Sequence, residues 1–192
     1  RRHINDNDLK LINSKLKIPL NLEIAATSEM LRIAKKRRPK FICIVPEKRK
    51  EITTEGGLNL KKNQKLLKGI ISKFQKKKIR TSLFVNPKLS DIQIAKKLSA
   101  DCIEIHTGHL SNLVKSGKSY AKELDRIIKC SIFAYNSGIE VHAGHGLDYK
   151  TTKILNRIKE IKEFNIGHFI IGESIFFGLS KIIKNFKEIL KK

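Results

Sequence analysis

The stretch CIEIHTG at residues 102–108 joins a short run of apolar and β-branched residues to a threonine and a glycine. A short apolar run of this kind is typical of a strand in a parallel sheet that is covered on both faces. His106, Thr107 and Gly108 then stand where the strand ends. The same arrangement recurs along the chain and decides the fold class.

Five more short runs predict strands, and amphipathic segments between them predict helices. The strands are expected at 20–24, 41–45, 79–85, 102–106, 139–143 and 164–168. The helices are expected at 5–15, from 28 to just before Pro39, and at 61–77, 91–98, 117–137, 151–159 and 174–190. Strands that alternate with helices in this way predict parallel βαβ units.

The residues that follow these strands favour a (β/α)8 TIM barrel over a flavodoxin-like open sheet. In a barrel, functional residues gather at the carboxyl ends of the strands. Here those ends carry Glu23, the loop at 46–57, and the segments 106–108, 142–146 and 167–168. No glycine-rich dinucleotide fingerprint occurs, so a Rossmann cofactor site is not expected.

Eight strands are needed to close such a barrel, and six can be recognised. The chain also opens with a predicted helix and with Arg1 in place of methionine. We therefore expect residues 1–192 to form a single, partial barrel domain that lacks the first two βα units.

The composition is that of a folded protein that does not span a membrane. Of the 192 residues, 40% are hydrophobic and 31% are charged, and no apolar run approaches the ~20 residues of a membrane span. Cys43, Cys102 and Cys130 have no metal-binding spacing and leave an odd thiol. Cys43 and Cys102 stand in β-branched runs, where a buried free thiol behaves as a small hydrophobe, which indicates a reducing compartment and hence the cytoplasm.

The net charge of +23 raises the question of nucleic-acid binding. The excess is mostly lysine, which is scattered over every segment with only short clusters such as 76–78. This scatter argues against a nucleic-acid partner, although a basic nucleic-acid-binding protein stays the alternative function. Phosphorylated small substrates are compatible with the same charge.

Two carboxylates are candidates for acid–base chemistry. Glu23 follows an alternating run, and a carboxylate that points into a strand-lined interior is costly unless it is paired or used. Burial would raise its pKa toward the range that is useful in catalysis. Glu104, in the middle of its strand, is a second carboxylate of the same kind. A structural pair with a barrel Arg or Lys is the alternative for both.

Histidine and glycine residues follow the later strands. His145 stands between two glycines in VHAGHG, at 141–146, where its imidazole could transfer a proton near neutral pH. A surface-loop histidine is the alternative reading. Gly146, Gly167 and Gly172 resemble backbone donors for a phosphate, which barrels often bind just before their last helix. The loop at 46–57 has the length of a lid, or of a plain solvated loop.

Seven segments, taken together and in order, resemble the PdxJ family of pyridoxine 5'-phosphate synthases. They are RRHI (1–4), NLEIA (21–25), VPEKRKEITTEGGL (45–58), SLFV (82–85), IEIHTG (103–108), AGHGL (143–147) and NIGHFIIG (165–172). The resemblance implies a (β/α)8 barrel that assembles as a homo-octamer. It implies condensation of 1-deoxy-D-xylulose 5-phosphate with 3-amino-2-oxopropyl phosphate into pyridoxine 5'-phosphate, phosphate and water, without a metal or an organic cofactor.

The resemblance also implies roles at matching positions. Glu23 corresponds to the catalytic proton acceptor, His145 to the proton donor and Glu104 to a further active-site carboxylate. His3 and Thr53 correspond to contacts with deoxyxylulose phosphate. Gly146, Gly167 and His168 correspond to contacts with the amino-ketone phosphate.

The sequence also departs from the family pattern. The family's first two strands end in Asn-x-Asp-His and His-x-Arg-Glu-Asp motifs, which supply another catalytic histidine, and neither motif is present here. His142 stands where the family usually has Asn, and Glu173 where Arg is common. An inactive remnant of the barrel is therefore an alternative, and so is another phosphate-binding barrel of the aldolase or isomerase type.

Overall fold

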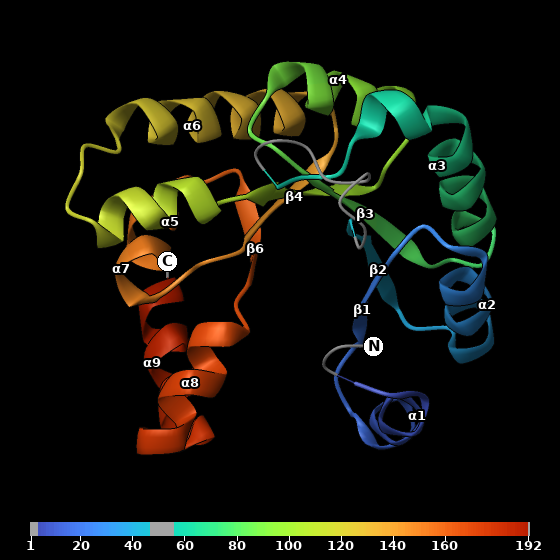
Figure 1. Cartoon of the computed structure of the whole chain (residues 1–192), viewed down its shortest axis with the longest axis horizontal. Helices are drawn as coiled ribbons and strands as arrows, with labels where there is room; N and C mark the ends of the chain where they lie inside the picture. Colours follow the sequence, from blue (N-terminus) through green and yellow to red (C-terminus); the bar gives the residue numbers. More distant parts are fainter. Residues whose placement is uncertain (1–3, 47–55, 192) are drawn as a thin grey trace.

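Each strand of the sheet pairs in parallel with the strand that follows it in the chain, in the order β1-β2-β3-β4-β5-β6 (Figure 1). The computed structural model describes residues 4–46 and 56–191. The strands are β1 (Asn21–Ile24), β2 (Phe41–Ile44), β3 (Arg80–Val85), β4 (Cys102–His106), β5 (Glu140–Gly144) and β6 (Ile161–Asn165). The predicted α/β fold with parallel strands is confirmed.

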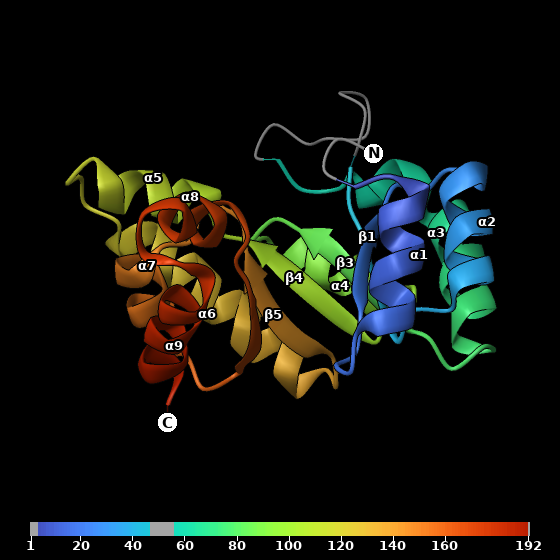
Figure 2. The same cartoon turned by 90° about the horizontal axis from the view of Figure 1, so that it is seen from below.

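Helices connect the strands and cover the outer side of the curved sheet (Figure 1). They are α1 (Asp6–Lys15), α2 (Ser28–Arg37), α3 (Leu60–Gln75), α4 (Leu89–Lys97), α5 (Gly108–Lys115), α6 (Ala121–Asn136), α7 (Tyr149–Leu155), α8 (His168–Phe177) and α9 (Leu179–Leu190). Figure 2 shows α1 and α2 at one end of the molecule and α7, α8 and α9 at the other. The sheet is therefore a half-barrel that is open between β1 and β6.

The two faces of the sheet differ in chemistry because successive side chains in a strand point to opposite faces. The outer face is apolar and packs against the helices; it includes Leu22, Ile24, Ile42, Ile44, Leu83, Val85, Ile103, Ile105, Val141 and Ala143. The inner face is largely polar; it includes Asn21, Glu23, Cys43, Arg80, Ser82, Glu104, His106, His142, Glu163 and Asn165. A polar inner face on a curved parallel sheet is a suitable wall for a site that binds polar molecules.

The part of the inner face where β3 and β5 begin holds a network of charged side chains, which we call the lower network. Arg80 on β3 donates to Glu140 on β5 at 2.6 Å and to Glu163 on β6 at 3.0 Å. The amide of Asn21 on β1 donates to Glu163 at 3.3 Å, so the two edge strands approach each other through their side chains. These contacts hold the curvature of the sheet.

The prediction of the last strand at 164–168 is wrong, because β6 runs from Ile161 to Asn165 and His168 already opens α8. The apolar residues at 169–171 continue the run, and periodicity alone does not separate a short buried strand from the start of a buried helix. The segment predicted as helical at 174–190 contains a break at Gly178, whose φ is +78°. The sequence analysis also missed α5, which directly follows β4.

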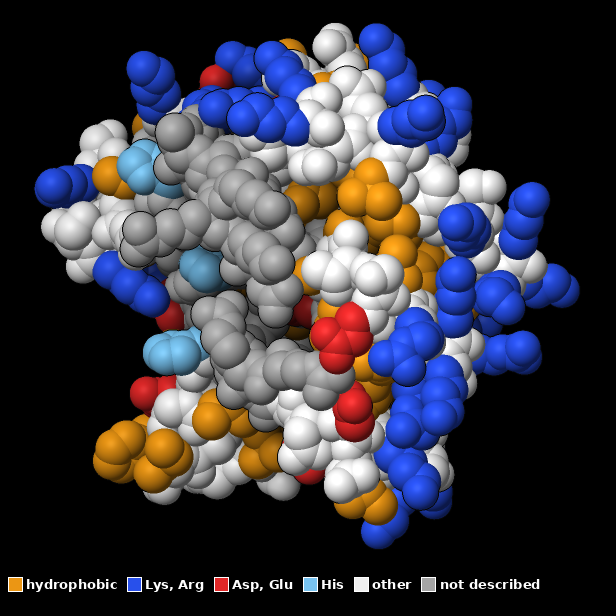
Figure 3. Space-filling view, turned by 45° about the vertical axis from the view of Figure 1, so that its right-hand side comes forward, with side chains coloured by type: hydrophobic (Ala, Val, Ile, Leu, Met, Phe, Trp, Pro, Cys, Tyr) orange, Lys and Arg blue, Asp and Glu red, His pale blue; other side chains and the backbone are white. Residues whose placement is uncertain are grey.

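Charge is distributed over the outside of the molecule. Figure 3 shows Lys and Arg side chains mainly along the top and the right of this view, while His side chains lie in its left half. A group of exposed apolar side chains lies on α8 and at the start of α9: Ile171, Ile175, Phe176, Phe177 and Leu179. Among the helices that the structure describes, none has both the length and the apolar character needed to cross a bilayer.

Candidate active site

Glu104 is the central side chain of the inner face. It lies on β4 with only 4% of its surface exposed. Its Oε2 accepts a hydrogen bond of 2.7 Å from the Asn165 amide on β6 and one of 3.5 Å from the Cys43 thiol on β2. Glu104 therefore connects three strands near the ends at which functional residues were expected.

Burial and, after it, the neighbouring charge of Glu23 raise the pKa of Glu104 to about 7. The hydrogen bonds from Asn165 and Cys43 act against this rise because they favour the ionised form. A carboxyl group with this pKa can both accept and release a proton near neutral pH.

Glu23 faces the same interior from β1, where its register partner is Cys43 on β2. Its charge acts on both Glu104 and Cys43. Burial, followed by the charges of Glu104 and Glu23, raises the pKa of the Cys43 thiol well above its usual value. Glu23 itself is exposed, so the burial that we expected at this position is found at Glu104 instead. The two carboxylates share one region of the inner face.

His145 follows β5 and has a left-handed backbone with φ of +79°. This conformation is uncommon for a residue other than glycine. The Thr107 hydroxyl donates to the carbonyl oxygens of Gly144 at 2.7 Å and of His145 at 2.8 Å, which fixes the turn. The imidazole of His145 is thus placed at the carboxyl end of the sheet by its backbone.

The imidazole of His145 stacks on that of His106, with ring centroids 4.7 Å apart and ring planes at 23°. The ring of Phe84 meets His106 edge-on at 5.2 Å. A Cβ atom at Gly108 would lie 2.7 Å from Cε1 of His106 and 2.8 Å from Cδ2 of His145, so only glycine fits beside the stacked rings. His106 is two residues beyond Glu104 on the same strand, so Glu104 and the stacked histidines lie on the same face of the sheet.

The predicted phosphate contacts lie at the same end. Gly146 is exposed, has φ of +78° and follows His145 directly. Gly167 is the N-cap of α8 and His168 its first residue, and both are exposed. The free amides at the start of a ten-residue helix, with the positive end of its dipole, form a favourable environment for an anion. Glu173 lies further along α8 and is partly buried.

Two predicted contacts, His3 and Thr53, lie outside the described residues, and so does most of the loop at 46–57. Gly56 is one of the described residues near the end of that loop, and a Cβ atom there would lie 2.8 Å from Nε2 of His106. The end of this loop is therefore packed against the stacked histidines.

His142, which the sequence analysis left unassigned, belongs to the lower network and is 1% exposed. Its Nε2 lies 2.8 Å from Glu140, and the donor atoms of Cys102, Glu140 and His142 lie within 4.8 Å of one another. The Arg80 guanidinium already holds Glu140, and it opposes a second cation there. Burial alone would raise the pKa of Glu140, but the contacts with His142 and Arg80 lower it.

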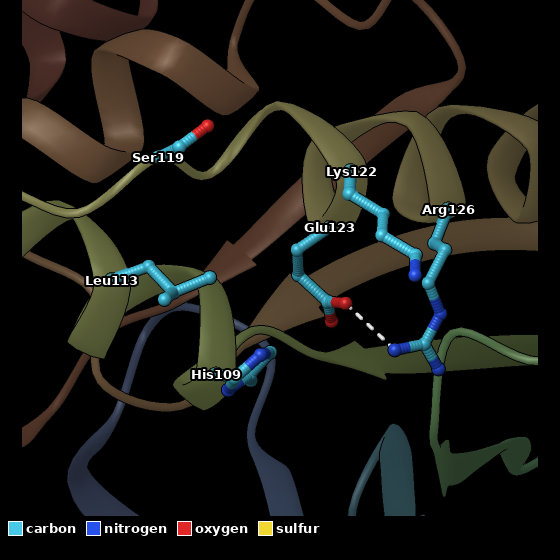
Figure 4. Close-up of a pocket in the computed structure, with 6 residues that line it drawn as sticks. All are labelled: His109, Leu113, Ser119, Lys122, Glu123 and Arg126. Carbon is cyan, nitrogen blue, oxygen red and sulfur yellow. Dashed lines mark hydrogen bonds and ion pairs between the residues drawn. The ribbon is translucent and has the colours of Figure 1, made fainter.

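A pocket of about 350 Å³ lies between α5 and α6 (Figure 4). Its lining residues are His109, Leu113, Ser119, Lys122, Glu123 and Arg126. Glu123 and Arg126 form an ion pair of 2.7 Å inside it. None of the candidate site residues lines this pocket.

The sequence analysis missed the roles of four residues in this site. Cys43 and Asn165 hold Glu104, His106 stacks on His145, and Gly144 has no side chain at the point where Glu104 crosses β5. For His106 a signal existed, because alternation within β4 places it on the same face as Glu104.

Comparisons with known proteins show the family to which this chain belongs. The family model described as pyridoxal phosphate biosynthesis protein PdxJ matches residues 1–192. A pyridoxine 5'-phosphate synthase from Pelagibacter ubique is 64% identical over 192 residues, which is 100% of this chain and 80% of the relative. The synthase from Zymomonas mobilis is 48% identical over 190 residues, which is 99% of this chain and 73% of that relative.

A solved structure, the Amycolatopsis orientalis BexX/CysO complex, is similar in fold alone. The match has a TM-score of 0.61 at 11% identity and covers 95% of this chain and 72% of the chain of known structure. The match of the family model over the full sequence and the high identity to the synthases show the family as well as the fold. The chain belongs to the PdxJ family of pyridoxal phosphate biosynthesis proteins.

Proposed function

We propose that this protein is a pyridoxine 5'-phosphate synthase. In this reaction 1-deoxy-D-xylulose 5-phosphate condenses with 3-amino-2-oxopropyl phosphate, and pyridoxine 5'-phosphate, inorganic phosphate and water are released. The relatives that carry this name support the proposal, at 64% and 48% identity. The observation that carries it is Glu104, a carboxyl group with a pKa of about 7 beside Glu23 and at the same end of the sheet as His145.

The chemistry fits what these residues offer. The amino-ketone substrate brings its own amine, so an imine can form without a lysine nucleophile, and no metal or organic cofactor is needed. Ring closure requires repeated proton transfers and loss of water, which positioned side chains speed by ~10²–10⁴-fold. We assign Glu23 as proton acceptor and His145 as proton donor, with Glu104 as a third group that is close to half-ionised at neutral pH.

The two phosphates need separate anion sites. We assign Gly146, Gly167 and His168 to the amino-ketone phosphate, because Gly146 lies just after β5 and Gly167 and His168 form the start of α8, where free amides favour an anion. His3 and Thr53 are assigned to deoxyxylulose phosphate from the family motif alone. Orientation of both substrates by these sites would supply much of the rate.

The fold that we propose for the complete enzyme is a single-domain (β/α)8 barrel. The polar inner face and the half-barrel curvature support it, and two further strands between β6 and β1 would close it. We also propose a homo-octamer, as the family resemblance implies. Cys43, Cys102 and Cys130 are buried free thiols, which fits a reducing compartment and hence the cytoplasm.

The test is synthesis by the full-length protein. The two phosphorylated substrates are mixed with the enzyme, and pyridoxine 5'-phosphate and inorganic phosphate are measured together. We expect equal amounts of the two products, and a loss of ~10²-fold or more in kcat in Glu23→Gln and in His145→Asn. Rates close to wild type in both variants would reject the assigned roles, and no product from the wild type would reject the function.

A further inference from the structure

The side chain of Glu104 crosses the inner face to reach its partners. The register pairs Glu104 with His142 on β5, and it pairs Gly144 on β5 with Asn165 on β6. Glu104 therefore reaches Asn165 on a diagonal path over Gly144. A Cβ atom at Gly144 would overlap the carboxyl group of Glu104 and would lie 3.2 Å from Cβ of Asn165. Glycine at 144 opens the path that this contact needs.

The two oxygens of Glu104 are not equivalent. Oε2 accepts the hydrogen bonds from Asn165 and Cys43, whereas in the described part of the chain no donor reaches Oε1. The amide of Asn165 has two N–H groups and cannot take a proton from the carboxyl, so it acts as a fixed donor. A carboxyl group held by one oxygen presents the other one in a fixed direction.

We propose that Asn165 is a positioning residue for Glu104: its amide holds Oε2 and leaves Oε1 as the atom that exchanges a proton with the substrate. This inference rests on the proposed function, because it concerns the same site. It adds a residue to which neither the family motif nor the candidate chemistry gave a role.

The charges around Glu104 explain why this contact matters. Glu23 on β1 and Glu163 on β6 oppose its ionisation, as burial does, while Asn165 and the Cys43 thiol on β2 favour it. The Asn165 bond is the shorter of the two hydrogen bonds. Without it, the carboxyl group would stay protonated to a higher pH and would be free to rotate.

The test compares Asn165→Ala and Asn165→Asp with the wild type in the full-length enzyme. Isotope-edited infrared spectra of labelled glutamate, with Glu104→Gln as the reference that identifies the Glu104 band, follow its ionisation directly. We expect the Glu104 midpoint to rise by about one pH unit in Asn165→Ala, since each lost donor to a carboxylate is worth roughly that much. The rise should be larger in Asn165→Asp, which also adds a negative charge.

The control is Asn185→Asp, which makes the same chemical change on α9, where the amide donates to the Tyr149 hydroxyl at 3.1 Å. It should leave the Glu104 midpoint unchanged. The pH profile of kcat should move with the midpoint in the Asn165 variants, while KM for both substrates changes little.

An unchanged Glu104 midpoint in folded Asn165→Asp would overturn the inference, and so would an equal shift in Asn185→Asp. The infrared titration needs no turnover. A wild type that makes no product therefore rejects the proposed function, while the titration still decides whether Asn165 holds Glu104.

Discussion

The imidazole rings of His106 and His145 lie face to face, 4.7 Å apart at the end of β4 and β5. The Phe84 ring packs edge-on against the His106 ring, and Gly108 leaves room for both imidazoles. The two rings are therefore held by packing. The proton donor that we assign is therefore oriented by a second histidine that belongs to the same strand as Glu104.

Replacing His106 tests this orientation. We expect His106→Ala to lower kcat by about five- to tenfold, because an aromatic pair is worth ~1 kcal/mol and the His145 ring would lose its support. His106→Phe keeps the stack and should recover most of the rate. His109→Ala, in the pocket between α5 and α6, is the matched control and should stay near wild type. Equal losses in His106→Ala and His106→Phe would count against a stacking role.

The raised pKa of Glu104 predicts a pH-dependent stability. The folded chain keeps this proton between 4.5 and about 7, a range in which the unfolded chain has released it. Stability from this group is therefore full below that window and falls as the pH rises through it, by about 3 kcal/mol. Urea unfolding at several pH values should show that the free energy of unfolding of Glu104→Gln rises relative to that of the wild type from pH 5 to pH 8. A constant difference between the two proteins would contradict the shift.

Gly144→Ala should be costly because the new Cβ atom would overlap Glu104. We expect a loss of about 1–3 kcal/mol in the free energy of unfolding, as for other overpacked sites. The loss should shrink when Glu104→Ala is added, since the two changes are coupled. Gly69→Ala in α3 is the control, because nothing lies within 4 Å of its added Cβ atom. A simple sum of the two losses in the double variant would mean that Glu104 is not the obstacle.

Arg80 is expected to hold the lower network together. Arg80→Met leaves Glu140 and Glu163 without the cation between them, and should lower the free energy of unfolding by about 1–3 kcal/mol. Lys129→Met, which removes an exposed pair with Asp125, should cost less than about 0.5 kcal/mol. Chemical denaturation of both variants measures the difference. Similar small effects would show that the Arg80 contacts add little.

Much of the fold was predictable because its signals are local. The first five strands were predicted within a residue or two, since each apolar run is short and is followed by polar residues or glycine. The sixth was displaced because the apolar residues after Asn165 belong to a helix and not to the strand. The short helix α5 was missed because it lies directly between a strand and the next long helix.

The contacts within the site were less predictable. Glu104 and Asn165 are 61 positions apart, and their contact depends on the register of three strands and on the curvature of the sheet. The stack of His106 on His145 depends on a left-handed backbone that no residue pattern specified. Motifs could suggest which side chains belong to the site, but only the assembled sheet determines which of them touch.

The opening between β1 and β6 has a consequence for how this chain can be handled. In the described residues, β1 and β6 each have one edge without a neighbouring strand in the sheet. Backbone amides and carbonyls along these two edges are ready to pair with another strand. At high concentration, two copies could join edge to edge and aggregate. The same edges would accept a separately added peptide that supplies a matching strand.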